Sequence, residues 1–254
     1  MMPLFSKGSM IVLESLSFTQ TLYAFDYDGT LARIVQKPDD AYLTKTTETL
    51  LKELSKYAPV AIVSGRGIAD MKKRIHFQPQ FLVCNRGLEV SDEVTPALDQ
   101  ALDDCNRWKT ALNAIKFSSG VELEDKVYSL AIHYRRSRSK KEDLKKIKEL
   151  VPDLVPAPRV VYGKSVVNLV PAQSPHKGTA VLDLIQRSQM KHIFYIGDDD
   201  SDEDVFSLDY NVGQIMTVRV GQKRSSLAKY FIKHQSEINQ VLKSIIQFYK
   251  RGQP

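Results

Sequence analysis

Two aspartates two residues apart follow a short apolar run near the start of the chain. Asp26 and Asp28 come directly after the apolar residues 22–25 and are followed by Gly29. The run predicts a buried strand that ends in a sharp turn, and residues i and i+2 of a strand tend to share a face. Two such carboxylates repel each other, and burying either one unpaired is costly. The pair indicates a site where a hard cation balances the charge and one aspartate attacks an electrophile; the alternative is an acidic turn.

A second acidic segment follows another apolar run, late in the chain. Residues 193–196 predict a buried parallel strand, and Asp198 begins a run of charges that includes Asp202. In open α/β sheets, ligands bind at the carboxyl ends of the strands, where both acidic segments are expected. Mg²⁺ takes about six oxygen ligands and usually keeps some for water or substrate phosphate. The two segments together therefore predict a Mg²⁺ site, the alternative being two solvated acidic loops.

Two further segments carry groups that could hold a phosphate. Ser64 and Gly65 follow the apolar residues 59–63, and their hydroxyl and amide can donate hydrogen bonds to phosphate oxygens. Lys177 stands where a helical pattern begins, a position that disfavours cations, so a nearby anion would explain it. A plain turn and an ordinary exposed lysine are the alternatives.

Composition argues against several classes of protein. The chain carries 36 Lys and Arg against 30 Asp and Glu, but the basic residues are spread out, and we expect no nucleic-acid binding. Its apolar runs are too short to span a bilayer, and its start does not have the pattern of a signal peptide. Cys84 and Cys105 form neither a disulfide framework nor a metal-binding spacing. We therefore expect a cytoplasmic protein without membrane association; the oligomeric state, and whether residues 1–9 are native and ordered, stay open.

Alternating strand and helix patterns predict an α/β fold, with a doubly wound parallel sheet in a Rossmann-like core. Residues 88–170 interrupt this alternation with helix, strand, helix and hairpin patterns, which indicate a small α+β unit. We therefore predict a core of residues 10–87 and 171–254, with residues 88–170 inserted as a cap. A cap would exclude stray water from a reactive intermediate and select the substrate. Its candidate substrate-facing residues are Lys126, His133, Arg135, Lys164 and Asn168.

Several segments make the chain resemble a known family. Residues 60–66, 121–135 and 197–206 are similar to motifs of the trehalose-6-phosphate phosphatases, within the haloacid dehalogenase phosphatase superfamily. The resemblance runs from about residue 22 to about residue 220 and includes both early aspartates. The chain departs from the family's pattern at Asn168, where glutamate is usual, and at Val170, where arginine is usual.

The resemblance implies the superfamily's fold and hydrolysis of trehalose 6-phosphate through an aspartyl-phosphate. Asp26 would be the nucleophile, and Asp28 would first donate and then accept a proton. Mg²⁺ would be bound by Asp26, Asp198 and the backbone carbonyl of Asp28. Asp202 would support the metal site by holding its ligands in place or through a water.

The remaining candidate residues would hold the substrate. Ser64, the amide of Gly65 and Lys177 would bind the phosphoryl oxygens, and we group Arg66 with Gly65 as substrate-binding. In the family, the glutamate at the position of Asn168 is expected to bind sugar hydroxyls. Asparagine can still form such a hydrogen bond, but without charge.

Three other functions are consistent with parts of this pattern. Asn168 leaves open a phosphatase for another sugar phosphate, such as mannosyl-3-phosphoglycerate or sucrose phosphate. A non-enzymatic phospho-acceptor would also combine an aspartate with Mg²⁺, but it would need neither Asp28 as an acid nor a large insertion. A sugar-binding pseudoenzyme is disfavoured because all of the phosphate-handling segments are intact.

Overall fold

The computed structural model describes residues 1–90, 96–208 and 215–252, and the chain divides into two compact units. The core unit comprises Met1–Ser91 and Pro175–Pro254, and the inserted unit comprises Asp92–Ser174. Within the described ranges, no helix combines the length and apolarity that a membrane span requires.

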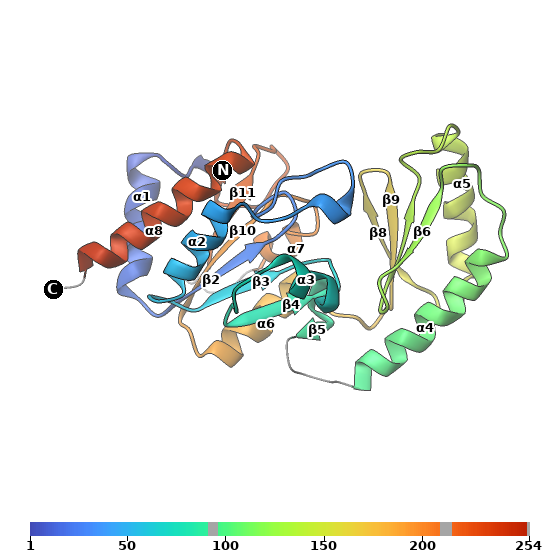
Figure 1. Ribbon diagram of the computed structural model, residues 1–254, viewed down its shortest axis with the longest axis horizontal. Helices are drawn as coiled ribbons and strands as arrows, with labels where there is room; N and C mark the ends of the chain where they lie inside the picture. Colours follow the sequence, from blue (N-terminus) through green and yellow to red (C-terminus); the bar gives the residue numbers. More distant parts are fainter. Residues whose placement is uncertain (91–95, 209–214, 253–254) are drawn as a thin grey trace. The chain divides into compact units, whose positions relative to one another are not determined.

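The core unit is built on one eight-stranded sheet (Figure 1). Its strand order is β1-β12-β11-β10-β2-β3-β4-β5, and all neighbours are parallel except β4 and β5. The strands are β1 (Met2–Pro3), β2 (Thr21–Asp26), β3 (Val60–Val63), β4 (Phe81–Cys84), β5 (Glu89–Val90), β10 (His192–Gly197), β11 (Ile215–Val220) and β12 (Tyr230–Ile232).

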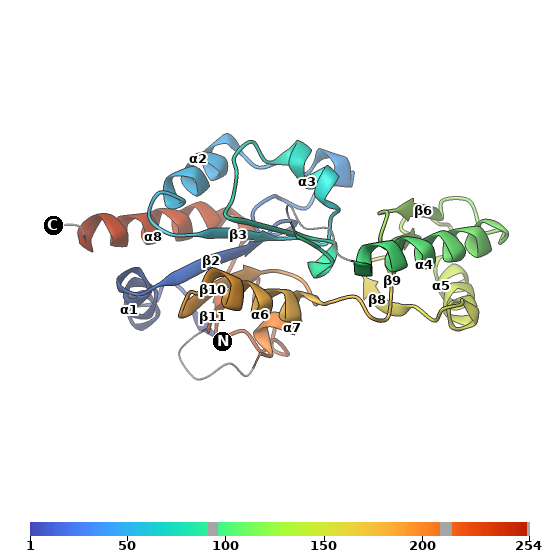
Figure 2. The ribbon, with the colours of Figure 1, turned by 90° about the horizontal axis from the view of Figure 1, so that it is seen from below.

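Helices cover both faces of this sheet, because β2 is apolar on both of its sides. Tyr23 and Phe25 join the apolar cluster formed with the first group of helices, whereas Leu22 and Ala24 join the cluster formed with the second. Figure 2 shows α2 and α8 on one side of the sheet and α6 and α7 on the other. The first group is α1 (Lys7–Ser15), α2 (Lys45–Leu54), α3 (Ile68–Arg74) and α8 (Ile238–Gly252); the second is α6 (Lys177–Ser188) and α7 (Glu203–Phe206). The doubly wound α/β prediction is confirmed.

The residues before Met10 form part of the core unit. Met2 and Pro3 pair with β12, and Leu4 is fully buried in the core. The helix α1 begins at Lys7, with the Ser6 hydroxyl accepting a hydrogen bond from the Ser9 amide at its start. A two-residue strand leaves no periodic pattern in the sequence, so tertiary packing alone reveals it.

The strand order reverses beside β2, which lies between β10 and β3. From β2 the chain proceeds through β3 to β4 on one side, and later through β10 to β11 on the other. Such a switch point is where open α/β sheets bind ligands, outside the carboxyl ends of the strands. Asp26 ends β2 at this point, in register with Val63 of β3.

The inserted unit is an antiparallel sheet with two helices packed on one face. Its strand order is β6-β7-β9-β8, and Trp108 and Ile147 of its helices pack on Ile132 and Leu169. The elements are α4 (Pro96–Asn113), β6 (Glu122–Asp125), β7 (Leu130–His133), α5 (Lys140–Leu150), β8 (Arg159–Gly163) and β9 (Val166–Val170). The sequence predicts a single strand between the two helices, whereas the structure has two, β6 and β7, with Val127 at φ 71° between them. The sequence of β6 is rich in charge, so it does not show the apolar pattern that predicts a strand.

Candidate active site

Asp26 and Lys177 form a buried ion pair at the switch point. Lys177 Nζ donates to Asp26 Oδ1 and to Asp202 Oδ1, each at 2.7 Å, and Lys177 and Asp26 are 3% and 4% exposed. Burial alone would lower the pKa of Lys177, but Asp202 and Asp26 raise it well above its usual value. The anion expected beside Lys177 at the start of a helix is therefore supplied by the protein, as the carboxylates of Asp26 and Asp202. Lys177 is held charged against the predicted nucleophile.

Asp202 is fully buried and organises the acidic segment. Its Oδ1 accepts from Lys177 and from the Tyr195 hydroxyl at 2.6 Å, and its Oδ2 accepts from the amides of Asp198 and Asp199 at 2.9 and 3.0 Å. These bonds fold the loop after β10 around one carboxylate. Tyr195 lies in an apolar run, and no sequence signal marked it as part of the site.

Asp198 presents a carboxylate oxygen that suits a cation. Its Oδ1 is buried and has no hydrogen-bond partner among the described residues. Burial raises the pKa of Asp198 to about 7, reinforced by Asp202 and Asp199. One oxygen each of Asp26, Asp198 and Asp202 lies within 4.8 Å of the others. Buried like charges and an unpartnered oxygen fit a hard divalent cation such as Mg²⁺.

Gly29 keeps this space open. It adopts φ +85°, and a Cβ atom at this position would overlap the carboxylate of Asp198. Only glycine adopts such a conformation readily and also permits this approach of the backbone. The glycine between the two acidic segments therefore has both a conformational and a steric cause.

Ser64 and Gly65 follow the neighbouring strand β3. Ser64 is 1% exposed, and its Oγ accepts from the Arg66 amide at 3.1 Å. Because Oγ is the acceptor, the hydroxyl proton is available to another group. Asp26 pairs with Val63, the last residue of β3. Ser64 is the next residue, so it lies at the same edge of the sheet as Asp26.

Asp28 is paired with Arg66. Arg66 Nε donates to Asp28 Oδ2 at 2.6 Å, and Nη2 donates to Oδ1 at 2.7 Å. The Asp28 side chain is 41% exposed, so it remains open to solvent in this pairing.

Arg219 of β11 braces the acidic segment from a distant part of the sequence. Its guanidinium donates to the carbonyls of Asp198 and Asp199 at 2.6 and 3.0 Å, and to Glu203 Oε1 at 2.7 Å. Its side chain is 7% exposed. Sequence reasoning missed Arg219, because a lone arginine in an apolar strand has no local motif.

In the inserted unit, Lys126 and His133 converge on a residue that the sequence analysis did not select. His133 Nε2 donates to Glu124 Oε2 at 2.7 Å, and Lys126 Nζ lies 3.7 Å from the same oxygen. Glu124 pairs with Ala131, and residues opposite each other in antiparallel strands share a face. This is the face of the sheet away from the helices. His133 shares this side, because it is two residues along β7.

The other three candidates of this unit differ in exposure. Arg135 and Lys164 are exposed, and Arg135 Nη2 donates to the Lys164 carbonyl at 3.4 Å. Asn168 is only 7% exposed, and its Nδ2 donates to the carbonyl of Val161 on β8 at 3.2 Å. The amide that was expected to meet sugar hydroxyls is thus partly engaged within the sheet.

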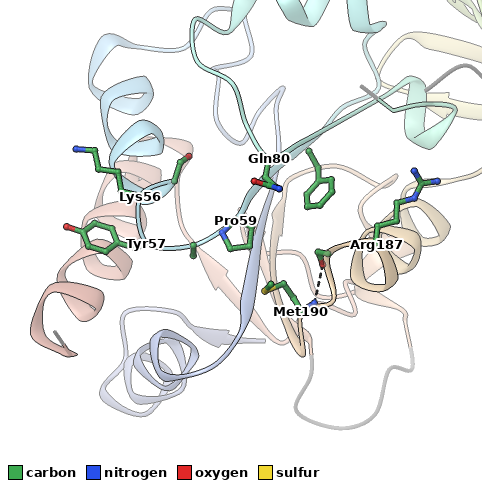
Figure 3. Close-up of a pocket in the computed structure, with 10 residues that line it drawn as sticks. Lys56, Tyr57, Pro59, Gln80, Arg187 and Met190 are labelled. Atoms are coloured by element: carbon green, nitrogen blue, oxygen red, sulfur yellow. Dashed lines mark hydrogen bonds between the residues drawn. The ribbon is translucent and has the colours of Figure 1, made fainter. Parts of the chain in front are cut away.

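A depression of about 430 Å³ lies at the opposite ends of the strands from Asp26. Pro59 precedes β3 and Phe81 begins β4, which places the depression at the amino ends of these strands (Figure 3). Its basic side chains are already paired, Lys56 with Glu53 and Arg187 with Asp183, both at 2.6 Å. The lining contains none of the predicted site residues; it consists of Ser55, Lys56, Tyr57, Ala58, Pro59, Gln80, Phe81, Arg187, Ser188 and Met190.

Known proteins share this sequence pattern and fold. The model of the family described as trehalose-phosphatase matches residues 24–236. The probable trehalose-phosphate phosphatase 4 of Oryza sativa subsp. japonica is 24% identical over 252 residues, covering 89% of this chain and 66% of that protein.

Solved structures agree with the fold class. The C-terminal domain of trehalose-6-phosphate phosphatase from C. albicans has a TM-score of 0.76 at 23% identity, covering 97% of this chain and 98% of that chain. A trehalose-6-phosphate phosphatase related protein also has a TM-score of 0.76, at 21% identity, covering 91% of this chain and 100% of that chain.

Proposed function

Because the chain belongs to the trehalose-phosphatase family, we propose that it hydrolyses trehalose 6-phosphate to trehalose and inorganic phosphate. The observation that carries this proposal is the buried Asp26 carboxylate, held by Lys177 at the switch point beside the unpartnered oxygen of Asp198. A buried carboxylate of this kind suits nucleophilic attack at phosphorus, and the lysine offsets repulsion from an anionic substrate.

The reaction proceeds in two displacements at phosphorus. Asp26 forms a bond to phosphorus while the bond from phosphorus to the sugar oxygen breaks, and Asp28 gives its proton to the departing oxygen. A water then attacks the phosphorus of the aspartyl-phosphate and loses a proton to Asp28. The bond between Asp26 and phosphorus breaks, which releases phosphate and restores both carboxyl groups.

The phosphoryl group is held by residues from the ends of β2, β3 and β10 and from the start of α6. Ser64 and the amide of Gly65 donate to its oxygens from one side, and Lys177 supplies positive charge from the other. Mg²⁺ would be held by Asp26, Asp198 and the carbonyl of Asp28, where it would neutralise charge on the phosphoryl oxygens. Asp202 supports this arrangement by orienting Lys177 and the amides of the acidic segment.

We assign the inserted unit the role of a cap that selects the sugar. The residues proposed for this role are Lys126, His133, Arg135, Lys164 and Asn168. Glu124 joins them, because it contacts both Lys126 and His133. The hydrogen bond from Asn168 to Val161 favours one alternative, a phosphatase for a different sugar phosphate. We further propose a cytoplasmic location, supported by two buried cysteines that are not joined in a disulfide.

Phosphate release from a panel of substrates tests the function. Trehalose 6-phosphate is compared with sucrose phosphate and mannosyl-3-phosphoglycerate, each with Mg²⁺ and with EDTA. We expect the highest kcat/KM for trehalose 6-phosphate and loss of turnover in EDTA. In Asp26→Asn, which keeps the shape of the side chain, turnover within about tenfold of wild type would refute the covalent mechanism. Preference for another sugar phosphate would refute the trehalose assignment alone.

A further inference from the structure

The guanidinium of Arg66 is largely committed to protein groups. It donates twice to Asp28, once from Nη1 to Asp70 Oδ2 at 2.8 Å, and once from Nη2 to the Pro38 carbonyl at 2.8 Å. A guanidinium has five N–H donors, and these bonds use four of them. Its side chain is 12% exposed. Little of Arg66 remains for a phosphate or a sugar.

Arg66 is itself held by a second acid and a second arginine. Asp70 uses its other oxygen to accept from Arg74 Nε at 2.9 Å, and Arg74 Nη1 donates to the carbonyls of Asp39 and Ala41 at 2.8 and 3.2 Å. Arg74 is 4% exposed, so the chain of contacts ends at a buried anchor. Burial raises the pKa of Asp70, but hydrogen bonds from Arg74 and Arg66 hold it below its usual value.

These contacts fix the orientation of the Asp28 carboxylate. Two parallel N–H···O bonds fix both the plane and the direction of a carboxylate, which a single contact does not. The side chain of Asp28 is nevertheless 41% exposed, so it is oriented without being enclosed. Each carboxylate oxygen has a second lone pair that Arg66 does not use, so Asp28 can carry a proton there while Arg66 holds it at a set angle to the departing oxygen.

We infer that Arg66 is a positioning residue that orients Asp28 for proton transfer, with Asp70 and Arg74 as its support, and that it is not a substrate-binding residue. This rests on the proposed function, in which Asp28 is the general acid. The inference predicts a specific kinetic pattern, because only a poor leaving group depends on protonation. A sugar alkoxide is a poor leaving group, whereas p-nitrophenolate departs with little help.

The test compares two substrates in two variants. Arg66→Lys keeps the charge but loses the two-pronged geometry, and Asp70→Asn removes the support while keeping Arg66. The quantity measured is kcat/KM, which reports events up to departure of the leaving group and is not affected by a slow second displacement. For trehalose 6-phosphate we expect a fall of about 10- to 100-fold. For p-nitrophenyl phosphate we expect a change within about threefold.

Inhibition by inorganic phosphate separates positioning from phosphate binding. We expect its inhibition constant to stay within about twofold of wild type in both variants, since Arg66 does not contact phosphate. Matched controls come from the exposed pair of Arg187 and Asp183 in α6, which lie four residues apart and 2.6 Å from each other. Arg187→Lys and Asp183→Asn should leave all three constants unchanged.

Two results would overturn the inference. Equal losses for both substrates, with weaker inhibition by phosphate, would make Arg66 a phosphate ligand. Unchanged kcat/KM for both substrates would remove any role in proton transfer. If Arg66→Lys fails to fold, as judged by circular dichroism, Asp70→Asn decides the question. A wild-type protein that releases phosphate from no monoester would instead refute the proposed function.

Discussion

Lys177 and Asp26 lie 151 positions apart in the sequence, yet their side chains meet at 2.7 Å with almost no exposure to solvent. Asp202 completes the arrangement on the other side of the lysine. The ammonium group thus offsets two buried carboxylates at once. Its loss should affect both folding and catalysis, because each carboxylate would remain buried with less compensation.

We predict that Lys177→Met lowers the free energy of unfolding by about 3–5 kcal/mol, as expected when one partner of a buried ion pair is removed. Urea unfolding in EDTA measures this. The effect should be smaller in the Asp26→Asn background, because that protein has one buried charge fewer. The control is Lys52→Met, which breaks the pair between the exposed Lys52 and Glu48 and should cost no more than about 1 kcal/mol. Equal losses of unfolding free energy for the two variants would show that the buried pair stabilises the protein no more than a surface pair does.

The raised pKa of Asp198 predicts a pH dependence of stability in the metal-free protein. With a folded pKa of about 7, against 3.8 in the unfolded chain, the folded state binds the extra proton between these values. Stability therefore decreases as pH rises through this window and levels off above about pH 7. We expect a loss of about 2 kcal/mol between pH 5 and pH 8 in EDTA.

Mg²⁺ and Asp198→Asn provide the checks on this pH dependence. The cation should restore stability most strongly at pH 8, where it replaces the missing proton. Asp198→Asn should reduce the pH dependence, because the amide does not titrate; the remainder comes from Asp26, whose pKa burial raises well above its usual value. The measurement is the melting temperature across pH, with and without Mg²⁺. A wild-type protein that gains stability from pH 5 to pH 8 in EDTA would contradict the prediction.

Arg219 should determine how well the acidic segment binds Mg²⁺. Arg219→Lys keeps the charge, but an ammonium group cannot span the two carbonyls and Glu203 as the guanidinium does. We expect the Kd for Mg²⁺, measured by calorimetric titration, to rise about 10- to 100-fold, as for other residues that orient metal ligands. Arg187→Lys, outside this segment, serves as the control. An unchanged Kd with a lower melting temperature would limit Arg219 to a folding role.

The strand-end residues of the site were predictable because local patterns mark them. Apolar runs that end in Asp26, Ser64 or Asp198 identify parallel strands, and parallel strands bring their carboxyl ends to one edge. The position of Lys177 at a helix start also required a neighbouring anion. The α/β class followed from the same alternation of strand and helix.

The supporting residues could not be predicted, because their partners are distant in sequence. Arg219 and Tyr195 stand in apolar strands, where a single polar group gives no periodic signal. The pairing of Asp28 with Arg66 spans 38 positions and depends on the turn after β3. Glu124 lies in a strand so rich in charge that it reads as a loop. These residues act through three-dimensional contacts that a one-dimensional pattern does not encode.

The last prediction concerns Asn168, whose amide donates to the Val161 carbonyl inside the sheet of the inserted unit. From the sequence, a carboxylate at this position would strengthen binding of a sugar hydroxyl. The structure adds a cost, because a carboxylate cannot donate and would face the carbonyl as a second acceptor. We therefore expect Asn168→Asp to destabilise the protein by about 1–3 kcal/mol, measured by urea unfolding at pH 8. Asn106→Asp, on the exposed side of α4, is the control and should have little effect. A stability equal to wild type, with a lower KM for trehalose 6-phosphate and an unchanged KM for p-nitrophenyl phosphate, would show instead that this side chain faces the sugar.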